Sequence, residues 1–243
     1  MTQLKQDRAR KTRQQVLEAA AAAFDERGYS ASIDDVVSKS QLTKGGVYYH
    51  FENKDALVQG VLDATKPGLT GAVEPQELKL QEWIDTGMVL AYRLPRDTLL
   101  RAALRLSMEP VVQQSLRTPW PAWIQHTTRQ LAVARTQKEL LPGVKIEDYG
   151  RMVAQAWAGI AALSPALDRG ATRDGGRADD ESHANMERWT AHMYASWLPS
   201  LAISGIIPLL NTRPDRGRQV WEARQRRQSQ QVTVLSVVHR LAG

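Results

Sequence analysis

The sequence has no cysteine, and its five histidines are scattered at positions 50, 126, 183, 192 and 239. Disulfides and thiolate metal sites are therefore excluded, and no two histidines have the spacing of a metal-binding motif. The Gly-x-Ser-x-Gly elbow, the phosphate-binding loop and the dinucleotide fingerprint are also missing. The chain is therefore not expected to be an enzyme, and we expect neither a cofactor nor a bound metal.

Long apolar runs are missing too. No uninterrupted apolar stretch approaches the roughly 20 residues of a membrane-spanning helix, and residues 1–13 are polar and basic, unlike a signal peptide. The hydrophobic share of 42% in 243 residues still suffices for a sizeable core. No polar–apolar alternation is long enough to indicate a sheet. We therefore expect a soluble, cytoplasmic, all-α protein with no membrane partner.

The net charge of +6 is concentrated at the two ends of the chain. Residues 1–13 contain five basic residues and one acidic residue, and residues 213–243 contain seven and two. The stretch 55–212 is close to neutral. Charge runs are usually solvated faces, but basic ends around a neutral body are also typical of proteins that touch a polyanion.

The most informative stretch is Thr43-Lys44-Gly45-Gly46-Val47-Tyr48-Tyr49-His50-Phe51. Thr43 is a good N-cap, Lys44 adds a cation, and the paired glycines remove side-chain bulk. Such a helix start can approach a phosphate backbone and a DNA groove closely. A glycine-rich turn between two helices is the equally plausible alternative for this stretch alone.

The residues around this stretch predict a compact helical unit. Apolar spacing predicts a first helix over 8–27, which ends at Gly28. Ser32 is expected to cap a second helix with Asp35 as its capping-box partner, and Asn53 is expected to cap a helix over 53–65. The pattern is that of a helix-turn-helix pair followed by a connecting helix.

The same residues resemble the DNA-binding domain of TetR-family repressors. The match covers some forty residues in order: Phe24-x-x-x-Gly28-Tyr29, Ile33-x-x-Val36-Val37 and the stretch from Thr43 to Phe51 followed by x-x-Lys54. In that family the second helix of the pair enters the major groove. The resemblance implies base-edge contact by Lys44, close approach at Gly45, and phosphate contacts from Thr43, Tyr48, Tyr49, His50 and Lys54. One of the two tyrosines and Phe51 are expected to pack inward.

The rest of the chain is expected to be helical throughout. Spacing predicts helices over 76–92, 96–108, 118–139, 147–167 and 182–203, with a loop over 168–181. We expect a DNA-binding domain at 1–54, a ligand-binding and dimerisation domain at 66–212, and a basic helical or flexible tail at 213–243. Helix 53–65 would be the single covalent connection between the first two.

The larger domain resembles the γ-butyrolactone receptor branch of the TetR family. The similar motifs are Arg101-x-x-x-Arg105-Leu106-Ser107-Met108-Glu109, Pro119-Trp120-x-x-Trp123-Ile124 and Trp197-Leu198-Pro199-Ser200. In that branch the tryptophan at the position of Trp123 closes over the ligand. An indole offers a broad apolar face and a single N–H donor, which suits a lactone ring and its carbonyl.

Without the resemblance, a tryptophan at helical spacing is more often plain core. The candidate ligand-binding residues are Trp123, Thr127, Trp83, Leu104, Met108 and Trp157. The chain also departs from the branch, because Ala158 replaces the hydroxyl residue that often precedes the glycine at 159. The loss of that donor extends the expected ligands to butenolides, furans and antibiotic intermediates.

The sequence thus predicts a nucleoid-associated repressor of antibiotic biosynthesis genes. It would bind a palindromic, double-stranded DNA operator as a homodimer, because one short recognition helix contacts too few base pairs for genomic specificity. A small lactone-type inducer would release it. The alternative is a multidrug- or antibiotic-sensing repressor of the same family, a pseudo-receptor in which Trp123 is incidental.

Overall fold

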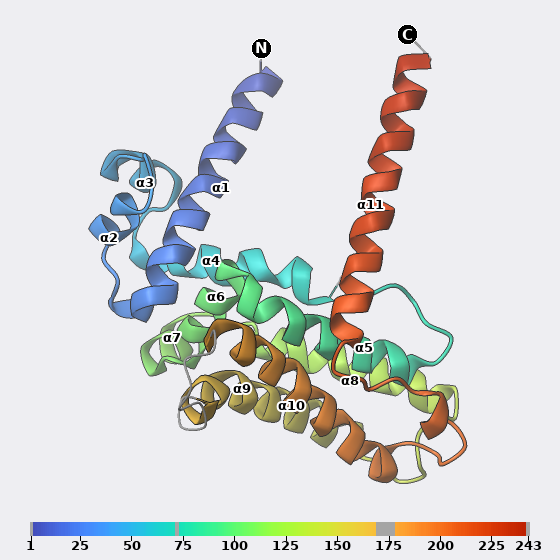
Figure 1. Cartoon of the computed structure of the whole chain (residues 1–243). Helices are drawn as coiled ribbons and strands as arrows, with labels where there is room; N and C mark the ends of the chain where they lie inside the picture. Colours follow the sequence, from blue (N-terminus) through green and yellow to red (C-terminus); the bar gives the residue numbers. More distant parts are fainter. Residues whose placement is uncertain (1, 71–72, 169–177, 242–243) are drawn as a thin grey trace. The chain divides into compact units, whose positions relative to one another are not determined.

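The chain folds into helices, as the sequence predicts (Figure 1). This computed structural model describes residues 2–70, 73–168 and 178–241, and the side chains within 6–66, 73–163 and 185–230. Within these ranges the helices are joined by turns, and the β-structure consists of an isolated bridge between Leu140 and Ala202. No helix within these ranges is long and apolar enough to cross a membrane.

The helices form two compact units that are not consecutive along the chain. The first unit contains residues 1–68 and 93–122, and the second contains residues 69–92 and 123–243. Segment 93–122, which the sequence analysis placed in the larger domain, therefore packs with the N-terminal helices. The expectation of a single covalent connection is wrong, because the chain passes between the units after residues 68, 92 and 122.

The first unit is built around the N-terminal helix and a helix from the middle of the chain. Its elements are α1 (Thr2–Arg27), η1 (Gly28–Ser30), α2 (Ile33–Ser38), α3 (Lys44–His50), most of α4 (Lys54–Thr70), η2 (Leu94–Arg96), α6 (Thr98–Met108) and α7 (Pro110–Ser115). Helix α4 continues beyond the expected end at residue 65, since Pro67 near its last turn removes one hydrogen bond without ending the helix. Pro110 ends α6 and also begins α7.

The helix caps are those that the sequence predicts. The Ser32 hydroxyl accepts from the Asp35 N–H while the Asp35 carboxylate accepts from the Ser32 N–H, which completes a capping box. The Thr43 hydroxyl accepts from the Gly46 N–H at 3.1 Å. The Asn53 side chain accepts from the Ala56 N–H at 2.8 Å at the start of α4. These caps fix where each helix of the pair begins.

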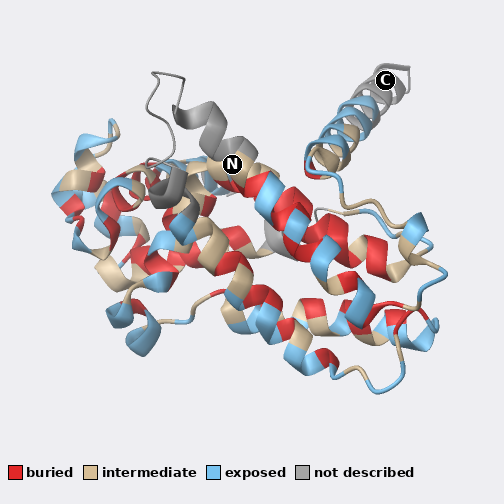
Figure 2. Cartoon of the chain, turned by 60° about the horizontal axis from the view of Figure 1, so that its bottom comes forward, coloured by how far each residue is buried: buried red, intermediate tan, exposed pale blue. Residues whose placement is uncertain are grey.

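The core of the first unit holds the helix-turn-helix pair in place. The apolar face of α1, represented by Val16, Ala20 and Phe24, is fully buried. It belongs to one cluster with Val47 and Phe51 from the α3 region and with the inner residues of α4 and α6. Figure 2 shows such buried positions along the helices. The expected inward packing of Phe51 is confirmed.

The second unit surrounds a separate apolar core. Its elements are α5 (Lys79–Arg93), α8 (Trp120–Thr136), α9 (Ile146–Asp168), α10 (Ala178–Leu201), η3 (Ile207–Leu209) and α11 (Arg216–Leu241). Arg93 at the end of α5 and residues 120–122 at the start of α8 belong to the first unit. Helices α9 and α10 lie side by side (Figure 1). Residues 169–177, most of the loop expected at 168–181, lie outside the described residues.

A buried carboxylate anchors the start of α5. Glu139, which is 3% exposed, accepts hydrogen bonds from the backbone N–H groups of Lys79 and Leu80 at 2.8 and 2.7 Å. Its own carbonyl accepts from the Ile203 N–H at 3.0 Å. The negative charge therefore satisfies otherwise unpaired donors at a helix N-terminus and ties that end of α5 to the chain after α8 and after α10.

We expect Glu139→Gln to lower the free energy of unfolding by about 1–3 kcal/mol, because a charge-assisted bond to two buried N–H groups is weakened. Urea denaturation followed by circular dichroism measures the change. Glu147→Gln, which alters an exposed residue in the first turn of α9, is the control and should cost only a few tenths of a kcal/mol. Equal losses in the two variants would contradict the anchoring role of Glu139.

Candidate DNA-reading surface and ligand site

Helix α3 presents a polar, sterically open surface to solvent. Thr43, Lys44 and Gly45 at its start are all exposed, and a side chain at Gly45 would meet no atom within 4 Å. Val47 is fully buried and fixes the opposite face of the helix in the core. The exposed face is therefore free to approach another molecule closely, as the sequence analysis expects.

Both tyrosines of α3 point outward. Tyr48 is 45% exposed and Tyr49 is 81% exposed, so the expectation that one of them packs inward is wrong. Val47 and Phe51 fill the inward positions, and a helix of seven residues has no further buried position to offer. The Tyr49 ring meets the His50 ring edge-on, with the ring centroids 5.0 Å apart. The surface thus carries two phenol groups and an imidazole side by side.

Lys44 is held by a neighbouring acid. Its ammonium lies 2.9 and 3.1 Å from the two carboxylate oxygens of Asp34 on α2. The hydrogen bond to Asp34 raises the pKa of Lys44, and the negative charge of Asp34 adds to the effect. Because both side chains are exposed, the pair is weak and a DNA base or phosphate can replace Asp34. The arrangement keeps the Lys44 side chain at the start of α3.

Lys54 is positioned by an aromatic ring that the sequence analysis did not assign to the site. Its ammonium lies 4.1 Å from the centroid of the Tyr29 ring. The Tyr29 hydroxyl donates to the Asp55 carboxylate at 2.6 Å, and this hydrogen bond is the main reason why the pKa of Tyr29 is raised. Tyr29 was visible in the sequence only as part of the family motif.

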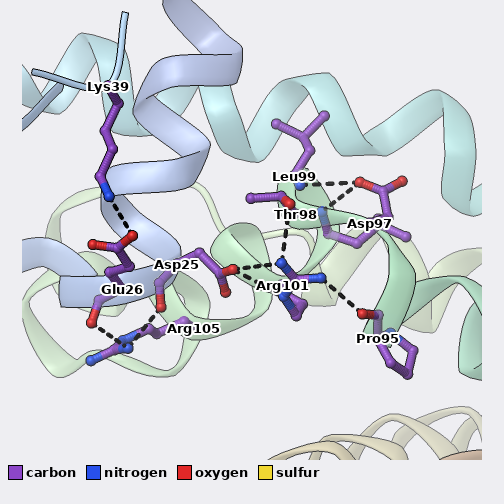
Figure 3. A network of polar contacts seen from close by, with 10 residues as sticks. Asp25, Glu26, Lys39, Pro95, Asp97, Thr98, Leu99, Arg101 and Arg105 are labelled. Carbon is purple, nitrogen blue, oxygen red and sulfur yellow. Dashed lines mark hydrogen bonds and ion pairs between the residues drawn. The ribbon is translucent and has the colours of Figure 1, made fainter. Parts of the chain in front are cut away.

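Helix α6 holds the C-terminal end of α1 through a row of polar side chains (Figure 3). Arg101 donates to the Asp25 carboxylate at 2.7 and 2.9 Å. Arg105 donates to the carbonyls of Asp25 and Glu26 at 2.8 and 3.0 Å, where the last carbonyls of a helix need partners. The arginines of the motif at 101–109 therefore stabilise the first unit.

The same row continues to the turn after α1. The Glu109 carboxylate accepts from the backbone N–H of Tyr29 at 2.7 Å. Gly28 has a φ of +60°, and a Cβ there would lie 2.0 Å from the Glu109 oxygen. Only glycine allows this turn and this close approach together. Glu109 thereby fixes the backbone at Tyr29, the residue whose ring lies against the Lys54 ammonium.

The second unit contains four of the six candidate ligand-binding residues. Trp83, Trp123, Thr127 and Trp157 are all buried there, between 0 and 3% exposed. Leu104 and Met108 belong to the first unit. Met108 is 42% exposed. Trp123 and Trp157 belong to neither of the two apolar clusters.

The buried part of the second unit holds several polar atoms without a hydrogen-bond partner among the described residues. The indole N–H groups of Trp83, Trp123 and Trp157 are three of them. Sequence reasoning missed the other four, which are His126 Nε2, Gln130 Oε1, Thr190 Oγ1 and the Tyr194 hydroxyl. Thr190 and Tyr194 lie on α10, each directly after a bulky residue, Trp189 or Met193.

Several of the residues that carry these atoms contact α5, α8 or α10. The rings of Trp83 and Tyr194 meet edge-on at 4.7 Å, and the Tyr194 hydroxyl lies where a Cβ of Gly87 would be. Gln130 donates to the Thr86 hydroxyl at 3.0 Å. On α8, the Trp123 and His126 rings are 6.3 Å apart. Most of the unpaired atoms are donors, so the arrangement can bind an apolar molecule that carries acceptor oxygens.

The electrostatics of this region favour an uncharged ligand. Burial, and then the neighbouring Arg129, lowers the pKa of His126, against a smaller opposing effect of Glu82. Burial, and then the charge of Asp85, raises the pKa of Tyr194. Both side chains are therefore neutral at pH 7. A buried anion would need a positive partner, and Arg216 is already paired with the buried carboxylate of Asp85.

Comparison with known proteins is consistent with this geometry. Residues 16–61 match the model of the family described as bacterial regulatory proteins, tetR family. The A-factor receptor protein of Streptomyces griseus is 32% identical over 204 residues, which are 84% of this chain and 68% of that protein. A TetR regulator of Streptomyces fradiae, TylP, superposes with a TM-score of 0.75 at 31% identity over 89% of this chain and 98% of that chain.

A second solved structure supports the fold. A γ-butyrolactone receptor described as ArpA-like superposes with a TM-score of 0.66 at 20% identity, covering 89% of this chain and 99% of that chain. At this identity the likeness concerns the fold alone.

Proposed function

The chain belongs to the TetR family of bacterial transcriptional repressors, and on this premise we propose that a small diffusible lactone controls its binding to DNA. A dimer binds a palindromic operator through α3 and leaves it when a γ-butyrolactone, butenolide or furan enters the second unit. The regulated genes are those of antibiotic biosynthesis. The observation that supports the lactone best is the buried Trp123, whose N–H has no partner among the described residues.

The DNA contacts divide into two kinds. Lys44 at the start of α3 supplies a base-edge contact, since a cation at the N-terminal end of a recognition helix reaches the bases of the major groove. Phosphate contacts come from Thr43, Tyr48, Tyr49, His50 and Lys54, with Gly45 allowing close approach. Phosphate contacts position the protein, whereas base contacts carry the sequence information.

The dimer interface is formed by helices α9 and α10 and their counterparts in the second copy. These helices expose large apolar side chains that a monomer would leave in water: Met152 is 44%, Leu163 57% and Trp189 47% exposed. A four-helix arrangement would bury them. A dimer of this kind holds its two recognition helices about 34–36 Å apart, which is one turn of DNA.

The ligand acts by favouring the spacing of the recognition helices that does not fit DNA. A lactone carbonyl would accept from the Trp123 N–H, and its ring and acyl chain would lie against the indoles of Trp83 and Trp157. A differential affinity of about 5.5 kcal/mol moves a two-state equilibrium from one state almost fully to the other. Ala158 supplies no donor, and the unpaired groups at Thr190 and Tyr194 offer other donors in the same unit.

A multidrug- or antibiotic-sensing repressor is the second candidate. The observation that favours it is the number of unpaired polar groups, seven among the described residues, which would let ligands of different shape find partners. The two candidates differ in how strongly the response depends on the Trp123 N–H.

We expect Lys44→Ala to reduce the preference for the operator over unrelated DNA by about 1–3 kcal/mol, because a base-edge contact is lost. Lys54→Ala should weaken binding to all sequences alike and lower the dependence of log K on log salt by about one unit. Fluorescence anisotropy with operator and scrambled duplexes at several salt concentrations measures both quantities. An unchanged preference in Lys44→Ala would remove the base-reading role.

We expect Leu163→Lys to shift the protein from dimer to monomer at micromolar concentration, since it would place a charge in the proposed interface. Sedimentation velocity measures the change. Val133→Lys on α8 is the matched control, because Val133 is also 45% exposed but lies outside α9 and α10. A wild-type protein that sediments as a monomer, or a Leu163→Lys dimer as stable as the control, would contradict the interface.

We expect Trp123→Ala to bind the operator but no longer to release it with inducer, so that it acts as a constitutive repressor. Loss of the buried indole should also destabilise the fold by about 3–5 kcal/mol. Trp123→Phe keeps an aromatic ring and loses the N–H, and it should raise the inducer concentration needed for release roughly tenfold. Gel shifts with a panel of γ-butyrolactones, butenolides and furans compare the three proteins. If both variants released the operator at the same inducer concentration as the wild type, Trp123 would be a core residue with no role in ligand binding.

A further inference from the structure

Helix α11 is strongly basic over the part whose side chains are described. Residues 216–230 contain five arginines, at positions 216, 218, 224, 226 and 227, against a single acid, Glu222. Arg218, Arg226 and Arg227 are exposed, and Arg224 is half-buried. The described apolar residues Val220, Trp221 and Ala223 lie near the start of the helix. Beyond them the described surface is polar on every side.

The first turn of α11 is fixed to the second unit by a buried ion pair. Arg216 donates to both carboxylate oxygens of Asp85 at 2.8 and 2.6 Å, and Asp85 is fully buried. This hydrogen bond is the main reason why the pKa of Arg216 is raised. A bidentate pair of this kind holds direction as well as position. Removing one partner would leave a buried charge unpaired, which is strongly destabilising.

Two further contacts hold the same turn. A Cβ at Gly217 would lie 2.0 Å from the backbone oxygen of Met88, so the α11 backbone touches the α5 backbone there. Gln81 donates to the carbonyl of Asn211 at 3.2 Å and accepts from its N–H at 2.7 Å. The helix therefore leaves α5 in a fixed direction, and the rest of it projects away from the helices of its own unit (Figure 1).

The projecting part is poorly stabilised by its own interactions. Arg224 and Arg227 are three positions apart on one face and repel each other. Arg226 and Glu222 form a pair at 3.9 Å between exposed groups, which contributes little. Residues 225–230 are all exposed, and a helical segment with like charges and no buried face gains most when a polyanion neutralises those charges.

We propose that the exposed arginines of α11 bind the phosphate backbone of double-stranded DNA, as a second contact that is separate from α3 and insensitive to sequence. This inference rests on the proposed function in that it requires the chain to bind DNA. Guanidinium groups suit phosphate because their planar fork donates two parallel hydrogen bonds. An anionic membrane surface fits less well, because helices that lie on membranes need a broad apolar face, and the apolar side chains of residues 216–230 are Val220, Trp221 and Ala223, near the start of the helix.

The test compares Arg226→Gln/Arg227→Gln with the wild-type protein. Glutamine has nearly the helix propensity of arginine, so the helix is kept while two charges are removed. The control is Arg135→Gln/Lys145→Gln, which removes two exposed charges elsewhere in the second unit. The affinities of all three proteins for operator and for scrambled duplex DNA are measured between about 50 and 200 mM salt, the range over which phosphate contacts dominate.

We expect the α11 variant to lower the slope of log K against log salt by about two units for each protomer bound, since each lost phosphate contact contributes about 0.9. Its affinity should fall by the same factor for operator and scrambled DNA, so the preference for operator stays that of the wild type. The control should keep the wild-type slope. Circular dichroism and sedimentation velocity check that helix content and oligomeric state are unchanged.

Several results would overturn the inference. A wild-type slope in the α11 variant would exclude the phosphate contact, and an equal drop in the control would reduce the effect to net charge. If the α11 variant kept the wild-type slope of log K for DNA against log salt but lost binding to vesicles with anionic phospholipids, α11 would be assigned to a membrane surface. If the wild-type protein bound neither duplex, the proposed function would itself fail. Wild-type operator binding that depends on Lys44 but not on α11 would reject the α11 contact alone.

Discussion

A seven-residue helix cannot hold its own shape in water, and the DNA-reading surface depends on this constraint. Helix α3 exists because Thr43 caps it and because Val47 and Phe51 pack into the core of the first unit. With these two positions buried, the remaining side chains of α3 are left for solvent or DNA. The candidate DNA-reading surface and the face that packs into the core are thus two faces of one short helix.

The support for α3 extends to helix α6, far along the sequence. Arg101 and Arg105 fix the end of α1, while Glu109 fixes the turn that carries Tyr29. Segment 93–122, which contains α6, belongs to the first unit, and the residues on both sides of it, 92 and 123, belong to the second. The two units are therefore joined by the polypeptide chain at three points, after residues 68, 92 and 122, and a change in the second unit can reach the first through each of them. This gives the proposed ligand response more routes than a single connecting helix would.

The second unit keeps seven side-chain polar atoms buried without a hydrogen-bond partner among the described residues. Each unsatisfied buried group costs about 1–3 kcal/mol, so a core of plain apolar residues would be more stable. A ligand with acceptor oxygens would recover part of this energy on binding. His126 and Tyr194 are neutral there, and Asp85 is already neutralised by Arg216. These conditions select an uncharged molecule, which agrees with the lactone proposed from the family resemblance.

The amino-acid sequence was enough to predict the helical class, the caps at Ser32 and Thr43, the family and the exposed surface of α3. These features depend on periodicity and on residues close together in the chain, which a sequence shows directly. Tertiary structure decided that α6 belongs with the N-terminal helices, that both α3 tyrosines face outward, and that Thr190 and Tyr194 are buried without partners. Each of these depends on which helix faces meet across long stretches of chain, and the apolar spacing of a single helix does not encode its partner.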